Sequence, residues 1–416
     1  MKKWPTIAFT AYLSLAAHAQ GISGTWKGEL NAGMFRLPLV LNITADETCR
    51  PVCCCATATC TLDSPLQNAK DIPAEVLFRS EDSLSISCRT INATYSARLQ
   101  GDTLRGTFVQ HGQPMPLNLT RGTYEARRPQ TPQPPFPYTT EEVQFVNAEA
   151  GATLSGTLSI PANAERPPVV LMVTGSEQQN RDEELFEHRP FAVLADYLAR
   201  HGIASLRYDD RGFGQSKGGE VKNVTTRDFA DDAQAGAEWL RRSGRFSKVG
   251  LLGHSEGGTI AFMLGAKGTL DFIVSLAGPA LKGDTLLYLQ QKALLGPLGG
   301  LTSIEGLRVN VLLSGNPWLL FYIDYDPQPD IARVSCPVFA LNGSKDLQVV
   351  PAPNLEALQR TLPPNKHHLL KEYPELNHLF QHCTTGHPKE YGTIEETISE
   401  EVPHDIADWI LTINQQ

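Results

Sequence analysis

The hydrophobic and polar positions of the chain follow two different patterns, and one gives way to the other near residue 130. Before that point, short runs alternate apolar and polar residues, as in Ser83-Leu84-Ser85-Ile86-Ser87. Such alternation is typical of strands in a sheet with one dry face. The predicted strands span 25–30, 37–43, 83–88, 93–99, 103–109 and 115–120. Turn-forming clusters separate them, so we expect an all-β domain over 20–127, closed as a small barrel or a sandwich.

A proline-rich stretch follows this region. Residues 128–137 contain five prolines, and a segment of that composition forms neither a helix nor a central strand. It favours an extended, semi-rigid spacer. We therefore place a linker between two domains at 128–137.

From residue 138 to residue 416 the pattern predicts strands alternating with helices, which is the pattern of an α/β fold with a mainly parallel sheet. Residues 169–173 form a continuous apolar run, as expected for a strand buried on both faces. Thr226 is the expected cap of a helix with one apolar stripe. Further strands are predicted at 203–207, 249–252, 272–276, 338–341 and 368–373, and a further helix at 191–200. Helical, aromatic-rich sequence interrupts the rhythm at about 279–334, and we interpret it as a cap.

The N-terminal residues have the pattern of a secretory signal. Lys2 and Lys3 precede an apolar stretch at 7–17, and Ala17-His18-Ala19 offers small residues at the cleavage positions. A membrane anchor would need a longer apolar span of about 20 residues. We expect a signal peptide over 1–19 and export of a bacterial protein to the periplasm or the medium, with no membrane span.

Charge and cysteine content narrow the classes of partner. The formal net charge is -9, whereas a nucleic-acid-binding protein would need a basic excess. Export permits disulfides, and a bridge between Cys60 and Cys88, which both lie in strand-like segments, is one pairing that the sequence allows. No histidine stands at metal-finger spacing, so loop disulfides or free thiols are favoured over a metal site. The other cysteines of the first third are Cys49, Cys53, Cys54 and Cys55.

The segment Gly253-His254-Ser255-Glu256-Gly257 carries the strongest chemical signal. It has the pattern G-x-S-x-G and lies between a predicted strand and an apolar helix, where a sharp turn exposes a nucleophilic serine. Glycines two residues before and after the serine relieve crowding in that turn. An ordinary glycine-rich turn is the alternative. We predict that Ser255 is a nucleophile.

A serine needs a base, and the base needs an orienting acid. In this arrangement the chain order is serine, acid, histidine. Asp346 follows the strand predicted at 338–341, and His378 follows the strand predicted to end near 373. We therefore predict Asp346 as the acid and His378 as the base. The rival candidates are Asp324, Asp326 and Asp330 for the acid, and His382 and His387 for the base.

An oxyanion hole requires two N–H donors fixed in advance. One is expected to be the amide of Glu256, directly after the nucleophile. The other is expected from the loop after the strand at 169–173, where Gly175 lets the chain fold over the site. The amide of Ser176 is the predicted donor.

Several segments together resemble the α/β-hydrolase superfamily over nearly all of 138–416. They are the elbow, Gly175-Ser176, Asp209-Asp210-Arg211-Gly212-Phe213-Gly214-Gln215-Ser216, and the loops around Asp346 and His378. The greatest likeness is to exported bacterial esterases grouped with serine aminopeptidase-like hydrolases, some of which carry a β-rich domain in front. The resemblance implies that Asp209 to Ser216 braces the sheet. Two features depart from it: Thr174 stands where the family usually has histidine, and the cysteine cluster has no counterpart.

These features predict a serine hydrolase that cleaves small carboxylic esters through an acyl-enzyme, without metal or organic cofactor. Two alternatives stay open. A serine exopeptidase would need a subsite for a peptide terminus, for which the acidic candidates are Glu177, Asp182, Glu183 and Glu184. In the other alternative, the β-domain binds an envelope component and the hydrolase domain is an accessory. The sequence gives neither the oligomeric state nor the acyl preference.

Overall fold

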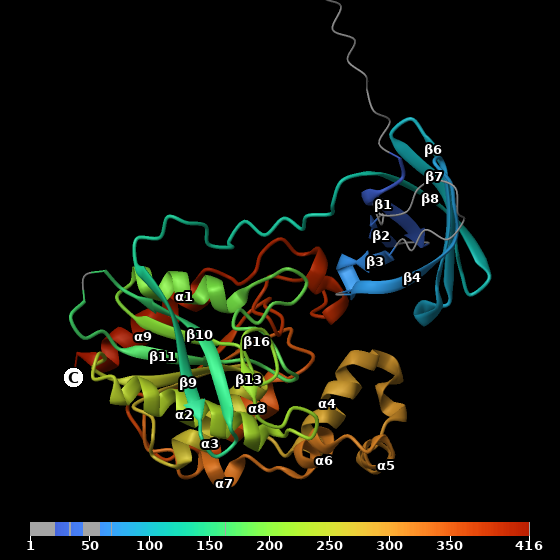
Figure 1. Ribbon diagram of the computed structural model, residues 1–416. Coiled ribbons are helices and arrows are strands. Elements are labelled where there is room, and N and C mark those ends of the chain that lie inside the picture. Colours follow the sequence, from blue (N-terminus) through green and yellow to red (C-terminus); the bar gives the residue numbers. More distant parts are fainter. Residues whose placement is uncertain (1–20, 33–34, 45–58, 68, 163, 416) are drawn as a thin grey trace, which may run out of the picture. The chain divides into compact units, whose positions relative to one another are not determined.

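The computed structural model of the chain contains two compact units, one ending at Glu125 and the other beginning at Ala126 (Figure 1). It describes residues 21–32, 35–44, 59–67, 69–162 and 164–415. The expected signal peptide and Cys49, Cys53, Cys54 and Cys55 lie outside the described residues.

The first unit is a closed antiparallel barrel in which each strand pairs with the next and β1 pairs with β8. This confirms the all-β prediction and selects the barrel over the sandwich. Alternate residues such as Trp26, Leu41 and Ile86 fill its interior. The strands are β1 (Gly24–Ala32), β2 (Phe35–Thr44), β3 (Thr59–Ser64), β4 (Ala69–Arg79), β5 (Ser83–Cys88), β6 (Ala93–Gln100), β7 (Thr103–Gln110) and β8 (Gln113–Arg121).

Cys60 and Cys88 both point into the barrel interior as free thiols, without the bridge that the sequence allowed. Burial raises the pKa of Cys60 to about 12 and that of Cys88 to about 11. Both thiols are therefore protonated at neutral pH, and they act as small apolar residues of the barrel core.

The second unit is built on a nine-stranded sheet in the order β13-β10-β12-β11-β14-β15-β16-β17, with β9 paired to β10. The strands from β12 to β17 are parallel, as the apolar runs predicted. The strand bounds are β9 (Thr139–Asn147), β10 (Ala152–Ile160), β11 (Val169–Val173), β12 (Ala204–Tyr208), β13 (Lys217–Gly218), β14 (Val249–His254), β15 (Ile273–Leu276), β16 (Val338–Gly343) and β17 (Leu369–Tyr373).

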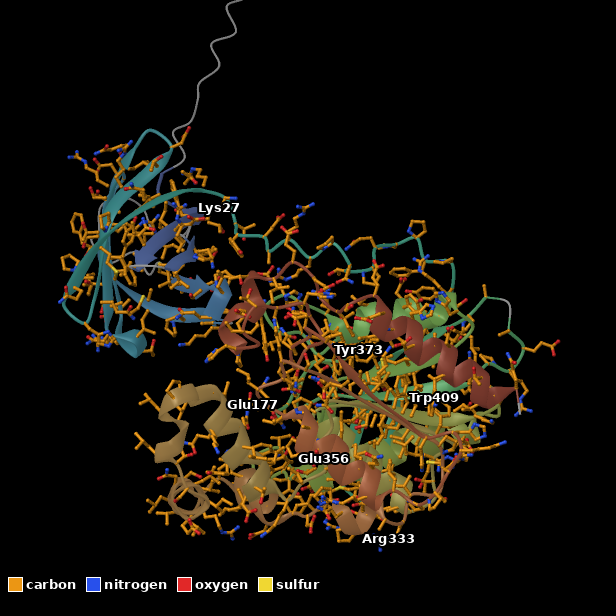
Figure 2. The ribbon with its side chains drawn as sticks, turned by 180° about the vertical axis from the view of Figure 1, so that it is seen from behind. Lys27, Glu177, Arg333, Glu356, Tyr373 and Trp409 are labelled. Atoms are coloured by element: carbon orange, nitrogen blue, oxygen red, sulfur yellow. The ribbon has the colours of Figure 1, made fainter. Side chains whose placement is uncertain are left out.

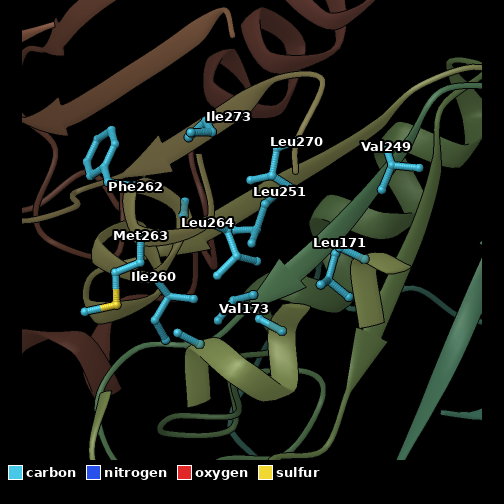
Figure 3. Packing of buried hydrophobic residues seen from close by; sticks show 14 of the residues in the cluster. Leu171, Val173, Val249, Leu251, Ile260, Phe262, Met263, Leu264, Leu270 and Ile273 are labelled. Atoms are coloured by element: carbon cyan, nitrogen blue, oxygen red, sulfur yellow. The ribbon is translucent and has the colours of Figure 1, made fainter. Parts of the chain in front are cut away.

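Helices cover both faces of this sheet (Figure 1). On one face lie α1 (Pro190–Arg200) and α9 (Glu401–Asn414). Trp409 of α9, labelled in Figure 2, packs its ring 5.6 Å from that of Phe339. The other face is covered by α2 (Thr226–Arg242), α3 (Glu256–Ala266) and α8 (Pro351–Thr361). Figure 3 shows Ile260 and Leu264 of α3 near Leu251 of β14, and each such buried side chain contributes about 1.5–3 kcal/mol.

Two local features differ from what the sequence suggested, although the sheet is mainly parallel as predicted. The second unit opens with an antiparallel hairpin, β9 and β10, because the connection between these strands is too short for a parallel crossover. Helix α2 is capped by Thr225 and not by Thr226. Asp228 stands three residues after Thr225, so the two side chains and backbone amides form a reciprocal capping box, while Thr226 is buried in the first turn.

Between β15 and β16 the chain leaves the sheet and forms a group of helices, which we call the cap. It comprises α4 (Gly283–Leu295), the 3-10 helix η3 (Gly296–Leu301), α5 (Ile304–Ser314), α6 (Pro317–Asp324) and α7 (Gln328–Ile331). Among the described residues, no helix is both long and apolar enough to cross a bilayer.

The proline-rich stretch is part of the second unit and is hydrogen-bonded to its loops. The guanidinium of Arg128 donates to the carbonyls of Phe186 and Gly392, both at 2.8 Å. The amide of Gln130 donates to the carbonyl of Ile398 at 2.7 Å. These bonds hold the stretch against the loop between β11 and α1 and against the segment that follows β17.

Candidate active site

Ser255 occupies a sharp turn between β14 and α3. Its backbone has φ 51° and ψ -118°, in the region that side chains rarely adopt. A Cβ on Gly253 would lie 2.0 Å from the carbonyl oxygen of Gly257, and one on Gly257 would lie 2.1 Å from that of Val173. The two glycines of the motif are therefore required by packing. The strained serine backbone is the geometry that the motif predicted.

The two amides expected to form an oxyanion hole lie on either side of this turn. Glu256 is the first residue of α3, so its N–H has no acceptor one turn back. Ser176 follows Gly175, where a Cβ would lie 3.4 Å from the Cβ of Ser255. Within the described chain, neither the Glu256 nor the Ser176 amide donates a hydrogen bond. Both remain available to a bound oxyanion.

Asp346 and His378 come together after β16 and β17. The Nδ1 atom of His378 lies 2.7 Å from Oδ2 of Asp346, and both side chains are buried. The other oxygen, Oδ1, accepts the amides of Gln348 and Val349 at 2.8 and 2.9 Å, which fixes the carboxylate. The structure thus brings together the two residues that the chain order predicted as acid and base.

The hydroxyl of Ser255 makes no hydrogen bond to the His378 imidazole in this structure. His378 instead packs against His254, the residue directly before the serine, with ring centroids 4.7 Å apart. Such bonds are often long in enzymes without substrate and shorten when substrate binds. The imidazole thus lies beside the turn that carries Ser255 and pairs with Asp346. The predicted hydrogen bond between the Ser255 hydroxyl and the imidazole is not formed.

The rival candidates are engaged elsewhere. Asp324 pairs with Arg308 in the cap, and His382 pairs with Glu396 at the surface. The remaining rivals have local bonds: Asp326 accepts the amide of Gln328, Asp330 accepts the Tyr325 hydroxyl, and His387 caps η4 (Pro388–Thr393).

A buried carboxyl, Asp210, holds the loop that carries Ser176. Its Oδ2 accepts the Thr174 hydroxyl at 2.9 Å and the Gln179 amide at 2.8 Å. Thr174 stands where the α/β-hydrolases that the chain resembles usually have histidine, and here it donates a hydrogen bond to Asp210. Burial raises the pKa of Asp210 to about 8, and the charges of Asp232 and Glu256 add to this against the two hydrogen bonds.

A second buried carboxyl, Glu183, binds the same loop from another side. Its Oε1 accepts the amide of Gly175 at 2.8 Å and faces Nδ1 of His254 at 2.8 Å. The Nε2 of His254 faces the carbonyl of His378 at 3.0 Å. Burial lowers the pKa of His254, but the charge and hydrogen bond of Glu183, with smaller help from the His378 carbonyl and from Asp346, raise it above its ordinary value.

The carboxyl of Glu256 is also buried. Burial raises its pKa, while the neighbouring Thr226 and Trp318 oppose the rise. The indole N–H of Trp318 donates to Oε1 at 2.8 Å, which links the elbow to α6 of the cap. The raised pKa favours the neutral form of a carboxyl that belongs to the same residue as a predicted oxyanion donor.

A cavity of about 560 Å³ opens in front of Ser255. Cap residues from α4 and α6 give it an apolar wall, and the loop around Ser176 and the segment at 221–222 give it a polar one. Its volume suits a small organic molecule. The apolar wall includes Leu286, Leu287, Trp318, Leu319 and Tyr322.

The acidic residues considered for a peptide terminus are mostly occupied. Asp182 pairs with Arg207, and Glu184 pairs with Arg189. Glu183 is bound as described above. Glu177, labelled in Figure 2, is exposed. It lines the cavity in front of Ser255. No cluster of three or more His, Cys, Asp or Glu side chains suited to a metal ion occurs within the part of the chain that the structure describes.

The segment from Asp209 to Ser216 braces the sheet, as the resemblance implied. Asp209 accepts two guanidinium N–H groups of Arg181, at 3.1 and 2.9 Å. Arg211 forms a buried two-bond ion pair with Asp232. The hydroxyl of Ser216 donates to the Asp209 carbonyl.

Three residues of the site were not assigned from the sequence: Asp210, Glu183 and His254. Asp210 and His254 lie inside motifs whose other members were assigned, and nothing in the local pattern marks either as a polar group buried beside the elbow. Glu183 was considered only as a ligand for an amine. Its contact with His254 joins residues 71 positions apart, and such pairings are decided by the tertiary fold.

Comparisons with known proteins found a family model and a relative that match parts of the chain. The family model described as serine aminopeptidase, S33, matches residues 187–311. Esterase EstD of Thermotoga maritima is 26% identical over 278 residues, which cover 62% of this chain and 65% of that protein. The match therefore spans just under two thirds of that relative's length.

Solved structures of low sequence identity also align with the chain. Est1E of Butyrivibrio proteoclasticus with bound ferulic acid has 19% identity and a TM-score of 0.44, covering 65% of this chain and 98% of its own. The Pyrococcus furiosus esterase Pf2001 has 17% identity and a TM-score of 0.45, covering 70% of this chain and 99% of its own. The fold assignment rests instead on the strand order, the helices on both faces and the elbow. Residues from Ala126 onward therefore have an α/β-hydrolase fold, and residues 187–311 match the family model described as serine aminopeptidase, S33.

Proposed function

We propose that this chain is a serine hydrolase that cleaves carboxylic esters through an acyl-enzyme formed on Ser255. The observation that carries the proposal is the strained serine at the mouth of a cavity, with a buried imidazole–carboxylate pair beside it. A hydroxyl in that position attacks a carbonyl when a neighbouring base removes its proton.

In the proposed mechanism, His378 takes the proton of Ser255 as its oxygen attacks the ester carbonyl. Asp346 holds the imidazole in the tautomer that leaves Nε2 free to act as the base, and it stabilises the imidazolium. The amides of Ser176 and Glu256 donate to the tetrahedral oxyanion. His378 then returns the proton to the departing alcohol, and water repeats the sequence on the acyl-enzyme.

Esters are proposed as the substrate class for two reasons. The relative from Thermotoga maritima is named an esterase, and the cavity offers an apolar wall for an acyl or alcohol group. An exopeptidase is the second candidate, because the matching family model is described as a serine aminopeptidase. Against it, three of the four candidate acids for an amine subsite have partners within the domain.

Ester and peptide activity can be separated with chromogenic substrates. The purified chain is expected to hydrolyse p-nitrophenyl esters and to leave aminoacyl anilides intact, and an acyl series from acetyl to decanoyl would map the cavity. Ser255→Ala should abolish turnover, whereas Ser335→Ala, at an exposed position before β16, should not change it. Anilide hydrolysis at a rate comparable with that of esters would favour the exopeptidase.

We also propose that the chain is exported and processed after Ala19. The basic residues, apolar stretch and small residues of the N-terminus support this. N-terminal sequencing of the protein from a bacterial host should find Gln20 first in the periplasmic or extracellular fraction. An unprocessed Met1 in the cytoplasmic fraction would contradict it.

A further inference from the structure

We propose that Glu183 and His254 form a charged pair that positions both the oxyanion loop and the base loop around Ser255. The inference rests on the proposed function and adds two positioning residues to it. Neither side chain is expected to touch the substrate.

The pair contacts three segments of the site at once. Glu183 Oε1 accepts the Gly175 amide at 2.8 Å, which fixes the chain one residue before the Ser176 donor. The same oxygen accepts Nδ1 of His254 at 2.8 Å. Nε2 of His254 donates to the carbonyl of His378 at 3.0 Å. Three contacts of this pair thus connect the loop of one predicted oxyanion donor, through the residue before Ser255, to the backbone of the predicted general base.

Both nitrogens of His254 face acceptors, so only the doubly protonated imidazolium satisfies both contacts. The surroundings are dry and largely apolar, with Phe191, Leu276 and Phe380 nearby. In such surroundings a charge-assisted bond is strong, and a charge left without its partner is costly. The charged or titratable side chains around the His254 ring are Glu183, Asp346 and His378.

A charged pair should make the kcat of a Glu183 variant depend on pH in a way that a merely structural contact would not. In Glu183→Gln the amide oxygen still accepts the Gly175 N–H, but the charge that raises the pKa of His254 is lost. His254 then becomes neutral as the pH rises, and one of its two bonds breaks. The kcat of this variant should fall about 10- to 100-fold at pH 8, as expected for a misplaced donor or base, with KM changed less than about threefold.

The loss should be smaller at pH 5.5 than at pH 8, because acid restores the imidazolium. The matched control is Glu184→Gln, which removes the neighbouring carboxylate that pairs with Arg189. This control variant should have the same kcat as the native chain at both pH values. A loss in Glu183→Gln that is equal at both values, or no loss at all, would overturn the proposal, provided that the native chain hydrolyses esters.

A measurement on the native full-length chain tests the pairing independently of activity, with one variant used only to assign the signals. With ¹⁵N-labelled histidine, His254 should give two protonated ring nitrogens at pH 7, and the signals should disappear in His254→Gln. A single protonated nitrogen would overturn the pairing. Failure of the proposed function would instead appear as no ester hydrolysis by the native chain, with the two His254 signals intact.

Discussion

The carboxyl groups buried near Ser255 fall into two sets, which differ in whether a histidine faces the carboxyl. Asp346 and Glu183 each face a histidine, so each negative charge has a partner. Among the described residues no cation pairs with Asp210 or Glu256, and both have raised pKa values, which favours their neutral forms. In the proposed mechanism an oxyanion develops between the amides of Ser176 and Glu256, and neutral acids on that side would oppose it less than carboxylates.

The Asp346 carboxylate gives the first prediction. Asp346→Asn keeps an oxygen for the amides of Gln348 and Val349 but presents an N–H to His378, which selects the wrong imidazole tautomer. The expected loss of kcat is about 10,000-fold for ester hydrolysis at pH 7. Circular dichroism should show an unchanged fold. A rate within tenfold of the native chain would remove Asp346 from the mechanism.

The pKa of Asp210 gives a prediction about stability. It is about 8 in the folded chain against an ordinary value of 3.8, so the unfolded state loses this proton first as the pH rises. This group therefore favours unfolding progressively from about pH 4 to about pH 8.

Asp210→Asn removes this titration while keeping an acceptor for Thr174 or Gln179. The change in melting temperature that this variant shows relative to the native chain should be more stabilising at pH 8.5 than at pH 5. The two changes should differ by the equivalent of at least about 1 kcal/mol in the free energy of unfolding. Calorimetry at the two pH values measures this difference. An equal shift at both would show that Asp210 is ionised throughout.

At the scale of elements, the turn between β14 and α3 depends on contact between backbones. A methyl group on Gly257 would meet the Val173 carbonyl of β11, so Gly257→Ala must push α3 away from the sheet. We expect a loss of about 1–3 kcal/mol in the free energy of unfolding, together with loss of activity. Gly300→Ala in η3 is the matched control, because a Cβ there meets nothing within 4 Å. Chemical denaturation of both variants should separate them clearly.

Elements with strong periodicity were predictable from the sequence. Every residue of β11, β14 and β16 is buried, and each strand begins with a short run that is mostly hydrophobic, which is the pattern of a strand covered on both faces. The chain order then located Asp346 and His378, because both follow strands that end at the same edge of a parallel sheet.

Other elements gave no such signal. β3 and β4 of the barrel were not predicted, and each pairing that β4 makes contains a shift of register. β4 also exposes Leu77 and Phe78 to solvent, which breaks the alternation of apolar and polar residues. The pairing of Glu183 with His254 was invisible for a different reason: a buried charge pair has no period, and its partners meet only after the sheet has formed.

At the scale of the molecule, every proposed site residue lies in the second unit, which has its own core on both faces of its sheet. The bonds of Arg128 and Gln130 also belong to that unit. A fragment beginning at Ala126 keeps all of these contacts. It should hydrolyse short-chain esters with a kcat/KM within about threefold of the full chain. A much larger loss would show that the barrel contributes to the active site.

The barrel has a complete interior of its own and contains none of the proposed site residues. If its role is to bind an envelope component, the isolated barrel should retain that binding while the fragment from Ala126 retains hydrolysis. Pull-down of the two fragments with purified cell-wall or glycan material compares them directly.

Covalent labelling tests the central claim, that Ser255 is the activated nucleophile, more directly than any rate. A fluorophosphonate probe should add to the full-length chain with loss of fluoride, and peptide mapping by mass spectrometry should place the phosphonyl group on Ser255. The adduct should form at a ratio of one probe per chain and be absent from Ser255→Ala. Labelling of another residue, or undiminished labelling of the variant, would contradict the account.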